Sequence, residues 1–414
     1  MIQPADFQKR ASALAALGAP GVQAANKKSY NTADYPGGLL LSANPRESHI
    51  APEFVKFDNI DHLTELFGVP DTLFSENGLV DTYPIPPAFE TVEETIDDPL
   101  HPYVCQAFAA YIFGNSQAVA SWKDTLNRLR FPLKGAVYAV EDITVQPGSP
   151  LILGAPAQEM PFGLNCHNLT IEDGAQVISQ APGHVDVQGV MSSGGAGGAN
   201  TVNLLSVGGN GGHGGNGSNS NNASVGATGA AATENGKSGC NAAGTGGLGF
   251  SATAATSGGI GAKGGDANSV NYTVAQMDGT YLVGSIGGNG GNGGNGGNGG
   301  NGGAGGPGGA GIRTCGKGAQ GKGGSGGAGG NGGNGGAGGA GSKVYINYSA
   351  GNPTFSFAPQ VANGGDGGDA GIGGQFGAGS PDGAPGAPGT TGNGGNGGTP
   401  GQVIINGGTP PSAA

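Results

Sequence analysis

Between Gly287 and Gly311 the sequence repeats glycine-glycine-X eight times in strict phase, and this triplet limits the available folds more than any other feature. Two of every three residues lack a Cβ, so an isolated α-helix or β-strand would lose roughly 0.5–1 kcal/mol per glycine. A period of three fits an extended left-handed helix with three residues per turn and a rise of about 3.1 Å per residue. Such a helix has no internal hydrogen bonds. These segments must therefore pack against one another or stay disordered.

The distribution of side chains predicts how many layers the packed segments form. A segment surrounded on all sides needs glycine everywhere, whereas a segment with one solvent face accommodates an X residue. Residues 287–311 and 323–341 follow the second pattern, which predicts two layers. Residues 383–401 keep glycine only at every third position, as expected at the edge of the array. The structural glycines that we single out are Gly287, Gly288, Gly290, Gly291, Gly293 and Gly294.

Two alternatives for the glycine-rich segments are a collagen helix and disorder. Collagen combines one glycine per triplet with abundant proline, and only residues 383–401 come near that composition. Neutral glycine-rich sequence is also typical of flexible linkers. The strict phase and the apolar stretches between the glycine runs favour ordered packing.

The composition is acidic and excludes several classes of partner. The formal net charge is −12 and no basic stripe offsets it, so we expect no nucleic-acid partner. No apolar run approaches the ~20 residues of a membrane span. Residues 1–17 contain Asp6, Lys9 and Arg10 and no apolar core of a signal peptide, so we expect no export by the general pathway.

Along the chain the sequence predicts four parts. Residues 1–145 read as a mainly helical globular domain with an attachment-like role, because helix patterns cover 60–67, 102–113 and 116–129. Short alternating apolar pieces at 146–191 predict a solenoid-like β-strand segment. Residues 192–408 read as a polyglycine-II sandwich with loops, and 409–414 as a tail. The predicted fold class is thus mixed: a helical domain, a short β-solenoid or sheet, and a two-layer polyglycine-II sandwich with interleaved β-strands.

The search for catalytic or metal chemistry gives no candidate. The four cysteines match no metal spacing, and the six histidines are scattered without a paired motif. A G-x-G-x-x-G pattern carries no information in a chain of this composition. We therefore expect a protein that is not an enzyme and that binds no cofactor or metal. Cys240 and Cys315 both lie in glycine-rich stretches, and a disulfide between them is one option.

Three breaks in the triplet phase are candidate recognition loops, at 218–257, 313–322 and 348–357. They are rich in the adaptable and anchoring side chains of binding loops. The alternative is that these breaks only reverse the chain. The candidate receptor-binding residues are Asn219, Asn222, Phe250, Arg313, Lys317, Gln320, Tyr348 and Asn352.

The phased runs at 287–311 and 323–341 resemble those of polyglycine-II sandwich proteins, such as the tip adhesins of T-even-like phage tail fibres and the snow-flea antifreeze protein. The repeats are also similar to the glycine-rich part of PE-PGRS proteins. The resemblance covers roughly residues 192–408 and is one of repeat type; residues 1–145 match no family. It implies a rigid glycine-rich brace whose distal loops bind a host receptor.

We therefore expect a non-catalytic recognition protein, an adhesin that binds a protein or glycan receptor on a cell surface. Residues 1–145 would attach it to a larger assembly, and a homo-oligomer is compatible with the sequence. The expected location is a virion or the extracellular space, without a classical signal peptide. The alternatives are a self-assembling structural protein (a filament, a matrix or a cytoplasmic inclusion), a toxin and an ice-binding protein.

Overall fold

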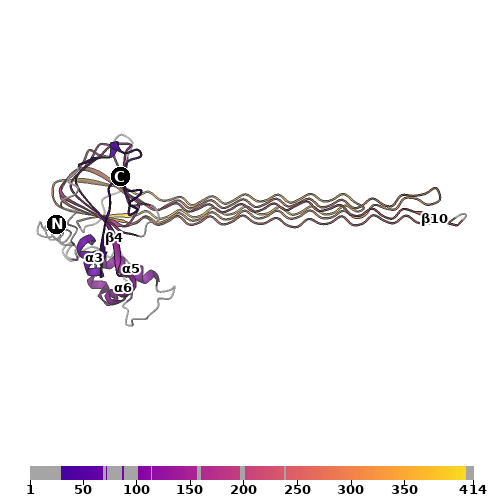
Figure 1. Cartoon of the computed structure of the whole chain (residues 1–414), viewed down its shortest axis with the longest axis horizontal. Coiled ribbons are helices and arrows are strands. Elements are labelled where there is room, and N and C mark those ends of the chain that lie inside the picture. The colour runs from indigo at the N-terminus through magenta and orange to yellow at the C-terminus, as the bar shows by residue number, and fades with distance from the viewer. Residues whose placement is uncertain are drawn as a thin grey trace.

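The computed structural model describes residues 29–68, 71, 86–87, 101–112, 114–155, 160–195, 201–236 and 239–406. These residues form a strand-rich body and a long, narrow arm that projects from one side of it (Figure 1). The first and the last described strands both belong to the body, so the arm is built entirely from the middle and later parts of the chain.

One 13-stranded sheet, nearly barrel-shaped, makes up the body. Neighbouring strands are parallel, except that β3 runs antiparallel to β4. Its strands are β1 (Tyr30–Asn31), β2 (Leu39–Leu41), β3 (Glu53–Phe57), β4 (Leu133–Val145), β5 (Leu151–Leu153), β6 (Phe162–Ile171), β7 (Val177–Ser179), β8 (Gly183–Ser193), β9 (Leu204–Val207), β12 (Val270–Ile286), β13 (Lys343–Ala350), β14 (Thr354–Ala358) and β15 (Gln402–Ile405).

The chain alternates between two faces of this sheet. One face, which we call sheet I, has the order β1-β4-β6-β8-β12-β13-β15. The other, sheet II, has the order β2-β5-β7-β9-β12-β14. The long strand β12 belongs to both faces, because its first half pairs with β8 and β13 and its second half pairs with β9 and β14. Such alternation stacks successive turns of the chain into a solenoid.

The interior between the two faces is an ordinary side-chain core. In β6, Leu164, Cys166, Leu169 and Ile171 are buried while His167 is exposed, which is the alternation expected of a strand with one face toward a core. Residues from both faces join one apolar cluster that extends from Leu39 to Val403. Hydrophobic burial therefore holds the body together.

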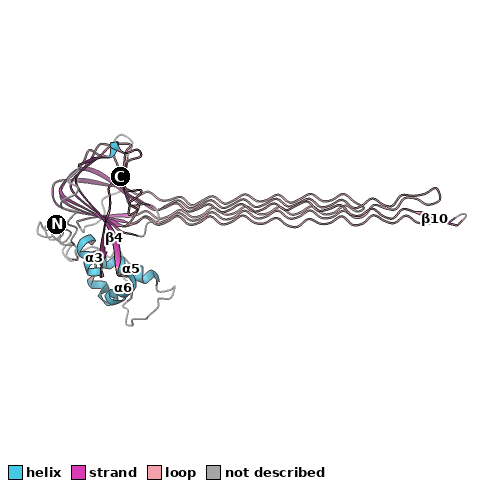
Figure 2. Cartoon of the chain, viewed as in Figure 1, coloured by secondary structure: helices cyan, strands magenta, loops and turns pink. Residues whose placement is uncertain are grey.

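The α-helices are α3 (Ile60–Phe67), α5 (His101–Ile112) and α6 (Lys123–Arg130), and the 3-10 helices are η1 (Thr32–Asp34) and η2 (Gln117–Trp122). The helices α3, α5, η2 and α6 form a small group that packs on the outside of sheet I, whereas the short helix η1 lies apart from them (Figure 2). The ring of Phe67 stacks on that of His184 in β8, with centroids 6.0 Å apart. A Cβ at Gly163 of β6 would lie 2.3 Å from Phe67, so this glycine permits the close approach of α3 to the sheet.

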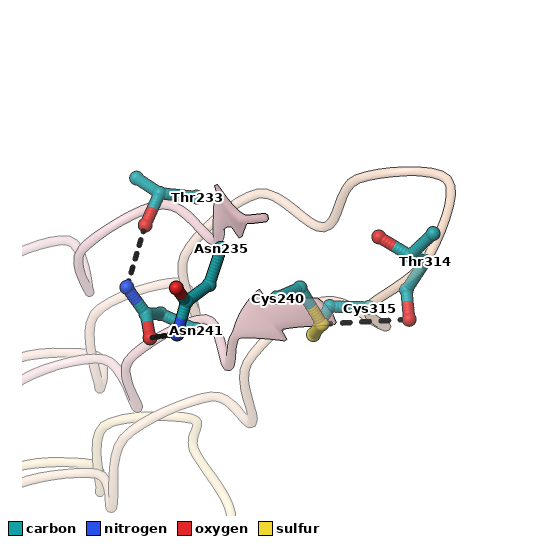
Figure 3. Close-up of a disulfide and its surroundings, with 6 residues drawn as sticks. All are labelled: Thr233, Asn235, Cys240, Asn241, Thr314 and Cys315. Carbon is teal, nitrogen blue, oxygen red and sulfur yellow. Dashed lines mark hydrogen bonds between the residues drawn. A yellow bond between two sulfur atoms is a disulfide. The ribbon is translucent and has the colours of Figure 1, made fainter. Parts of the chain in front are cut away.

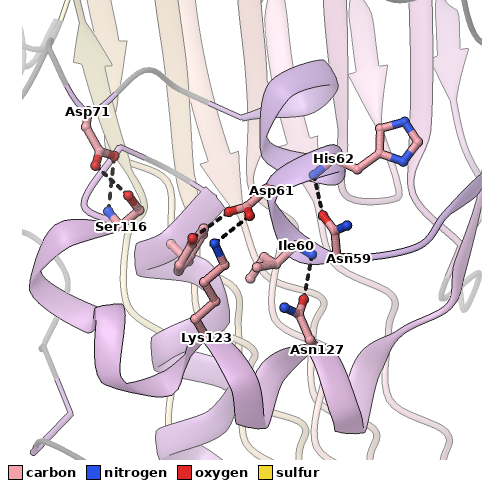
Figure 4. A network of polar contacts seen from close by, with 9 residues as sticks. Asn59, Ile60, Asp61, His62, Asp71, Ser116, Lys123 and Asn127 are labelled. Carbon is pink, nitrogen blue, oxygen red and sulfur yellow. Dashed lines mark hydrogen bonds and ion pairs between the residues drawn. The ribbon is translucent and has the colours of Figure 1, made fainter.

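Polar contacts tie the helices to one another (Figure 4). The Asn59 side chain caps α3 by accepting the His62 N–H at 2.9 Å. The Asp61 carboxylate accepts the Tyr111 hydroxyl at 2.6 Å and pairs with Lys123 at 2.5 Å. In the same group, Asn127 accepts the Ile60 N–H at 2.8 Å, which links α6 to the start of α3.

The predicted fold class is wrong, because the chain is mostly β and has no helical N-terminal domain. Strands β1 to β4 all come from residues 1–145, and β2 and β4 pair with β5 and β6 from beyond residue 145. The helices form only a covering layer on the sheet. Residues 30–57 form strands of two to five residues, too short to show a clear period in the sequence, and pairing with distant strands stabilises them. The predicted tail, 409–414, lies outside the described residues.

The arm consists of six extended segments that contain no α-helix or body strand. We call them coils 1 to 6; they cover 208–232, 242–269, 287–311, 316–342, 359–379 and 382–401. Coils 1, 3 and 5 leave sheet II and lie in one layer; coils 2, 4 and 6 return to sheet I and lie in the other. Within a layer, Gly211 of coil 1 donates to the Asn289 carbonyl of coil 3 at 2.8 Å. Between layers, Gly291 donates to the Ala262 carbonyl of coil 2 at 2.9 Å.

The register of the body continues unchanged through the arm. In sheet II Leu204 pairs with Val283, and in the arm the same separation of 79 residues joins Asn210 to Asn289. A separation of 74 residues likewise joins β12 to β14 and coil 3 to coil 5, and one of 59 residues joins β13 to β15 and coil 4 to coil 6. The two layers of the arm are therefore direct extensions of the two faces of the body.

Apart from Gly316 at the start of coil 4, the glycines of coils 3 and 4 have no room for a side chain. A Cβ at Gly290 would lie 1.9 Å from the Gly336 carbonyl oxygen, and one at Gly291 would lie 2.0 Å from that of Gly212. Coil 1 lies at the edge of its layer, and a Cβ at Gly212 would meet nothing within 4 Å. The number of neighbouring coils thus determines where glycine is obligatory.

Candidate functional site

The far end of the arm is its most distinctive surface. Coils 1 and 2 are joined there by a short hairpin, β10 (Thr233–Asn235) and β11 (Gly239–Asn241). Coils 3 and 4 are joined by a tight turn in which Ile312 and Cys315 form an isolated bridge. The connection between coils 5 and 6 lies closer to the body, because Gly305 of coil 3 already donates to the Ala378 carbonyl near the end of coil 5. We call the first two connections together, 233–241 and 312–317, the tip.

A disulfide between Cys240 and Cys315 joins the two connections of the tip (Figure 3). Cys240 pairs with Glu234 of β10, which lies at the end of the arm farthest from the body (Figure 1), and the Cys240 Sγ is 3.5 Å from the Thr314 carbonyl oxygen. Within the hairpin, Asn241 donates to the Thr233 hydroxyl at 3.2 Å. The crosslink fixes the hairpin β10–β11 relative to the turn between coils 3 and 4, at the end of the arm where the coils stop.

The tip exposes polar and charged side chains of both signs. Glu234, Asn235, Arg313, Thr314 and Lys317 are all exposed to solvent. They project from a backbone that is held by the disulfide and by the coils below. Such a surface can form charge-assisted hydrogen bonds with an acidic or polar partner.

A second surface, the outer face of the layer formed by coils 1, 3 and 5, carries the X side chains in regular columns. Five coil 1 side chains each accept the backbone N–H of the X residue beside them in coil 3, at 2.7–2.9 Å. Five coil 3 side chains each accept an N–H of coil 5 in the same way, at 2.8–3.0 Å. The accepting residues are Asn210, His213, Asn216, Asn219 and Asn222 of coil 1, and Asn289, Asn292, Asn295, Asn298 and Asn301 of coil 3.

The outer face of coils 2, 4 and 6 is less regular. Ser251, Ser257 and Asp266 of coil 2 accept an N–H of coil 4, but Leu248 and Ile260 occupy the same column and have no acceptor. At Asp266, burial raises the pKa of the carboxyl, but the Lys263 ammonium and the Ala340 N–H outweigh burial and leave the pKa below its usual value. A carboxylate can therefore replace an amide as the acceptor in these columns.

The structure separates the predicted receptor-binding residues into three places. Arg313 and Lys317 lie at the tip, and Gln320 lies just below it, where its amide donates to the Gly305 carbonyl at 3.2 Å. Tyr348 and Asn352 lie at the opposite end, in and after β13 of the body.

The other three predicted residues lie along the arm rather than in a loop. Asn219 and Asn222 belong to the coil 1 column, and Phe250 lies in coil 2 with 62% of its surface exposed. The predicted loop at 218–257 is mostly coil, interrupted only by the hairpin β10–β11. The signal that could have located this coil is the spacing of three from Asn210 through His213, Asn216 and Asn219 to Asn222, which continues where the glycines become sparse.

Sequence reasoning also missed a buried row of polar side chains on the outside of sheet I. The Asn347 amide donates to Asn271 at 2.9 Å, and the Asn271 amide donates to the Gly68 carbonyl at 3.1 Å and lies 3.0 Å from the His184 Nδ1. These three side chains are at most 1% exposed. The row connects three strands to the end of α3 and has the role of fixing the helices on the sheet.

In the part of the chain that the structure describes, no cluster of three or more histidine, cysteine or acidic side chains is arranged to hold a metal ion. The described helices are also too short or too polar for any of them to cross a lipid bilayer.

Comparison with known proteins identifies no family. No protein-family model matches the chain, and no curated protein matches it. Among solved structures, a springtail antifreeze protein from Granisotoma rainieri, described as a nine polyproline type II helical bundle whose crystal waters match the ice lattice, is 27% identical over 41% of this chain and 94% of its own length. The TM-score is 0.06, so this likeness carries no argument about fold or function.

Proposed function

We propose that this is a non-catalytic recognition protein in which a stiff arm presents the tip to a protein or glycan receptor on a cell surface. The disulfide between Cys240 and Cys315 is the observation that carries the proposal. The coils are already joined along their length by hydrogen bonds, so a further covalent link at their far end serves the geometry of the tip. Disulfides also persist in oxidising environments, which favours a location on a virion or outside the cell.

The dimensions of the arm support the same role. Coil 3 runs from Gly287 to Gly311, which corresponds to about 75 Å at about 3.1 Å per residue. The receptor contacts would be made at this distance from the body by Arg313, Lys317 and the hairpin β10–β11. In this proposal the body attaches the protein to a larger assembly.

The test is binding of the intact, oxidised protein to whole cells and to extracted surface proteins and glycans. The tip variant R313A/K317A should bind at least about tenfold more weakly, since charge-assisted contacts are among the strongest polar ones. The matched control K134A/K263A removes two exposed cations from the body and from the end of coil 2 nearest the body, and should bind as the parent does. Equal binding by both variants would refute a role for the tip, and fibres without any receptor binding would favour the self-assembling alternative.

A further inference from the structure

We propose that the outer face of coils 1 and 3 is a binding surface for a neutral polysaccharide chain lying along the arm. The face is separate from the tip, and this inference does not rest on the function proposed above. It concerns the ten X side chains that accept backbone N–H groups from the neighbouring coil.

The first observation is that the acceptor atom of every one of these ten side chains is already in use. In nine of them an amide oxygen accepts the N–H, which fixes the orientation of the carboxamide and leaves its Nδ2 amino group as the free end. In the tenth, His213 accepts through Nδ1, so its neutral ring carries the proton on Nε2. No Nδ2 group of the nine asparagines has a hydrogen-bond partner among the residues that the structure describes. The face therefore presents a row of unpaired amide donors beside oxygens that have each already accepted one N–H.

The second observation is the regular spacing and rigidity of these donors. In each column they recur every third residue, which corresponds to about 9 Å along the coil. The two columns lie side by side in register, because each N–H···O bond joins residues separated by 79 positions. Donors fixed in this way lose little freedom when a ligand binds, so the surface is preorganised.

The third observation is the absence of charge. Neither coil 1 nor coil 3 contains Asp, Glu, Lys or Arg, and the acidic residues beside them, Asp366 and Asp369, belong to the coil 5 column at the edge of the face. An uncharged, periodic array of donors fits a ligand with uncharged acceptor oxygens at regular intervals. A polysaccharide chain has these in its hydroxyl, ring and glycosidic oxygens, whereas the surface of a globular protein does not repeat in this way.

The opposite face of the arm provides a matched control within the same chain. There, Asn331 and Asn334 of coil 4 accept N–H groups of Thr390 and Asn393 at 2.9 Å, as the coil 3 residues do on their face. Their neighbouring column in coil 2 contains serine and isoleucine rather than a row of amides.

The substitution that tests the proposal is asparagine to aspartate at two positions on each face. Aspartate keeps an oxygen for the neighbouring N–H, as Asp266 does for Ala340 at 2.8 Å, but it has no amino group to donate. N298D/N301D removes two donors from the proposed face, beside Ile372 and Gln375 rather than beside an acidic residue. N331D/N334D makes the same change in charge and size on the other face.

Binding should be measured by co-sedimentation with insoluble cellulose and chitin and by affinity electrophoresis in gels that contain dextran, mannan or xyloglucan. We expect the parent protein to bind at least one of these neutral polymers. N298D/N301D should bind about five- to tenfold more weakly, the loss expected for two hydrogen bonds, and N331D/N334D should bind as the parent does. Absence of binding to every polymer, or equal weakening in the two variants, would overturn the proposal. Far-ultraviolet circular dichroism and thermal unfolding of both variants show whether the arm remains folded.

Discussion

The body and the arm share one strand order and one register but are held together by different forces. In the body, side chains such as Leu169 are fully buried between two faces of a sheet. In the arm, glycine backbones lie so close that a Cβ at Gly291 would be 2.0 Å from a carbonyl oxygen of coil 1. The comparison shows that a two-layered structure can continue beyond its hydrophobic core, provided that each coil bonds to its neighbours and lacks side chains where they meet.

This difference explains why the arm depends on the body. Fixing one residue costs roughly 1–2 kcal/mol of backbone entropy, and a net hydrogen bond returns only about 0.5–1.5 kcal/mol. Coils without a hydrophobic core are therefore expected to order only when something sets their register. The paired strands of the body, whose register continues into the coils, fulfil this requirement.

The largest expected effect is a loss of stability when a leucine of the body is truncated, compared with the same truncation in the arm. Leu169→Ala removes a fully buried side chain from the body and should lower the free energy of unfolding by about 2–5 kcal/mol. Leu248→Ala makes the same change in the arm, where the leucine is 69% exposed, and should alter it by no more than about 0.5 kcal/mol. Chemical denaturation followed by tryptophan fluorescence of Trp122 in the body measures the first effect. A large loss in Leu248→Ala would show that the arm has an apolar core after all.

Opening the disulfide should weaken the arm and leave the body unchanged. C240S/C315S removes a link between residues separated by 75 positions, and such links typically contribute about 2–4 kcal/mol. The loss should appear as faster hydrogen exchange in the distal parts of coils 1 to 4, with unchanged exchange in β4, β6 and β8. Equal acceleration in the body would contradict the separation of the two regions.

Glycine should be obligatory where coils meet and replaceable at the edge. Gly291→Ala forces a Cβ against the Gly212 carbonyl and should destabilise the arm by about 1–3 kcal/mol. Gly212→Ala places its Cβ in open space and should be neutral or stabilise by up to about 1 kcal/mol. Thermal unfolding of the two variants in parallel provides the measurement. If both variants lose stability equally, close backbone packing is not what requires glycine.

The smallest effect concerns the columns of X side chains. Asn298→Ala removes the acceptor for the Ile372 N–H and should cost about 0.5–1.5 kcal/mol. Gln375 belongs to coil 5, the last column of its layer, and its side chain accepts no N–H among the described residues. Gln375→Ala should therefore lower the stability less than Asn298→Ala does. Hydrogen exchange at Ile372 distinguishes the two variants, and equal exchange in both would mean that the Asn298 bond contributes nothing.

The strict phase of residues 287–311 indicates extended coils because glycine at two of three positions leaves few other options. It does not indicate where the coils begin, since coil 1 lies at an edge and tolerates Ser218, Asn221 and Ser224 where coil 3 needs glycine. Sparse glycine at 218–232 therefore predicts a loop. In the structure, Asn219 and Asn222 lie instead on the outer face of coil 1.

The body could be predicted only in part. The helix Ile60–Phe67 has a clear apolar period and a capping Asn59, and it is found with the expected bounds. Strands β1 and β2 contain two and three residues and depend on partners more than 100 positions away. Because local sequence does not encode such pairing, the helix patterns dominate residues 1–145 and predict a helical domain, although the helices only cover the sheet.

Hydrogen exchange of the backbone amides, resolved residue by residue, tests most directly the claim that bonds between coils hold the arm. The glycine amides of coil 3, such as Gly291 and Gly294, should exchange slowly, while the X amides of coil 1, such as Asn210 and Asn216, should exchange rapidly. In coil 1 one amide in three, such as those of Gly211 and Gly214, is bonded, so protection there should recur every three residues. Exchange at the rate of an unfolded chain throughout 287–311, with a protected body, would contradict the account.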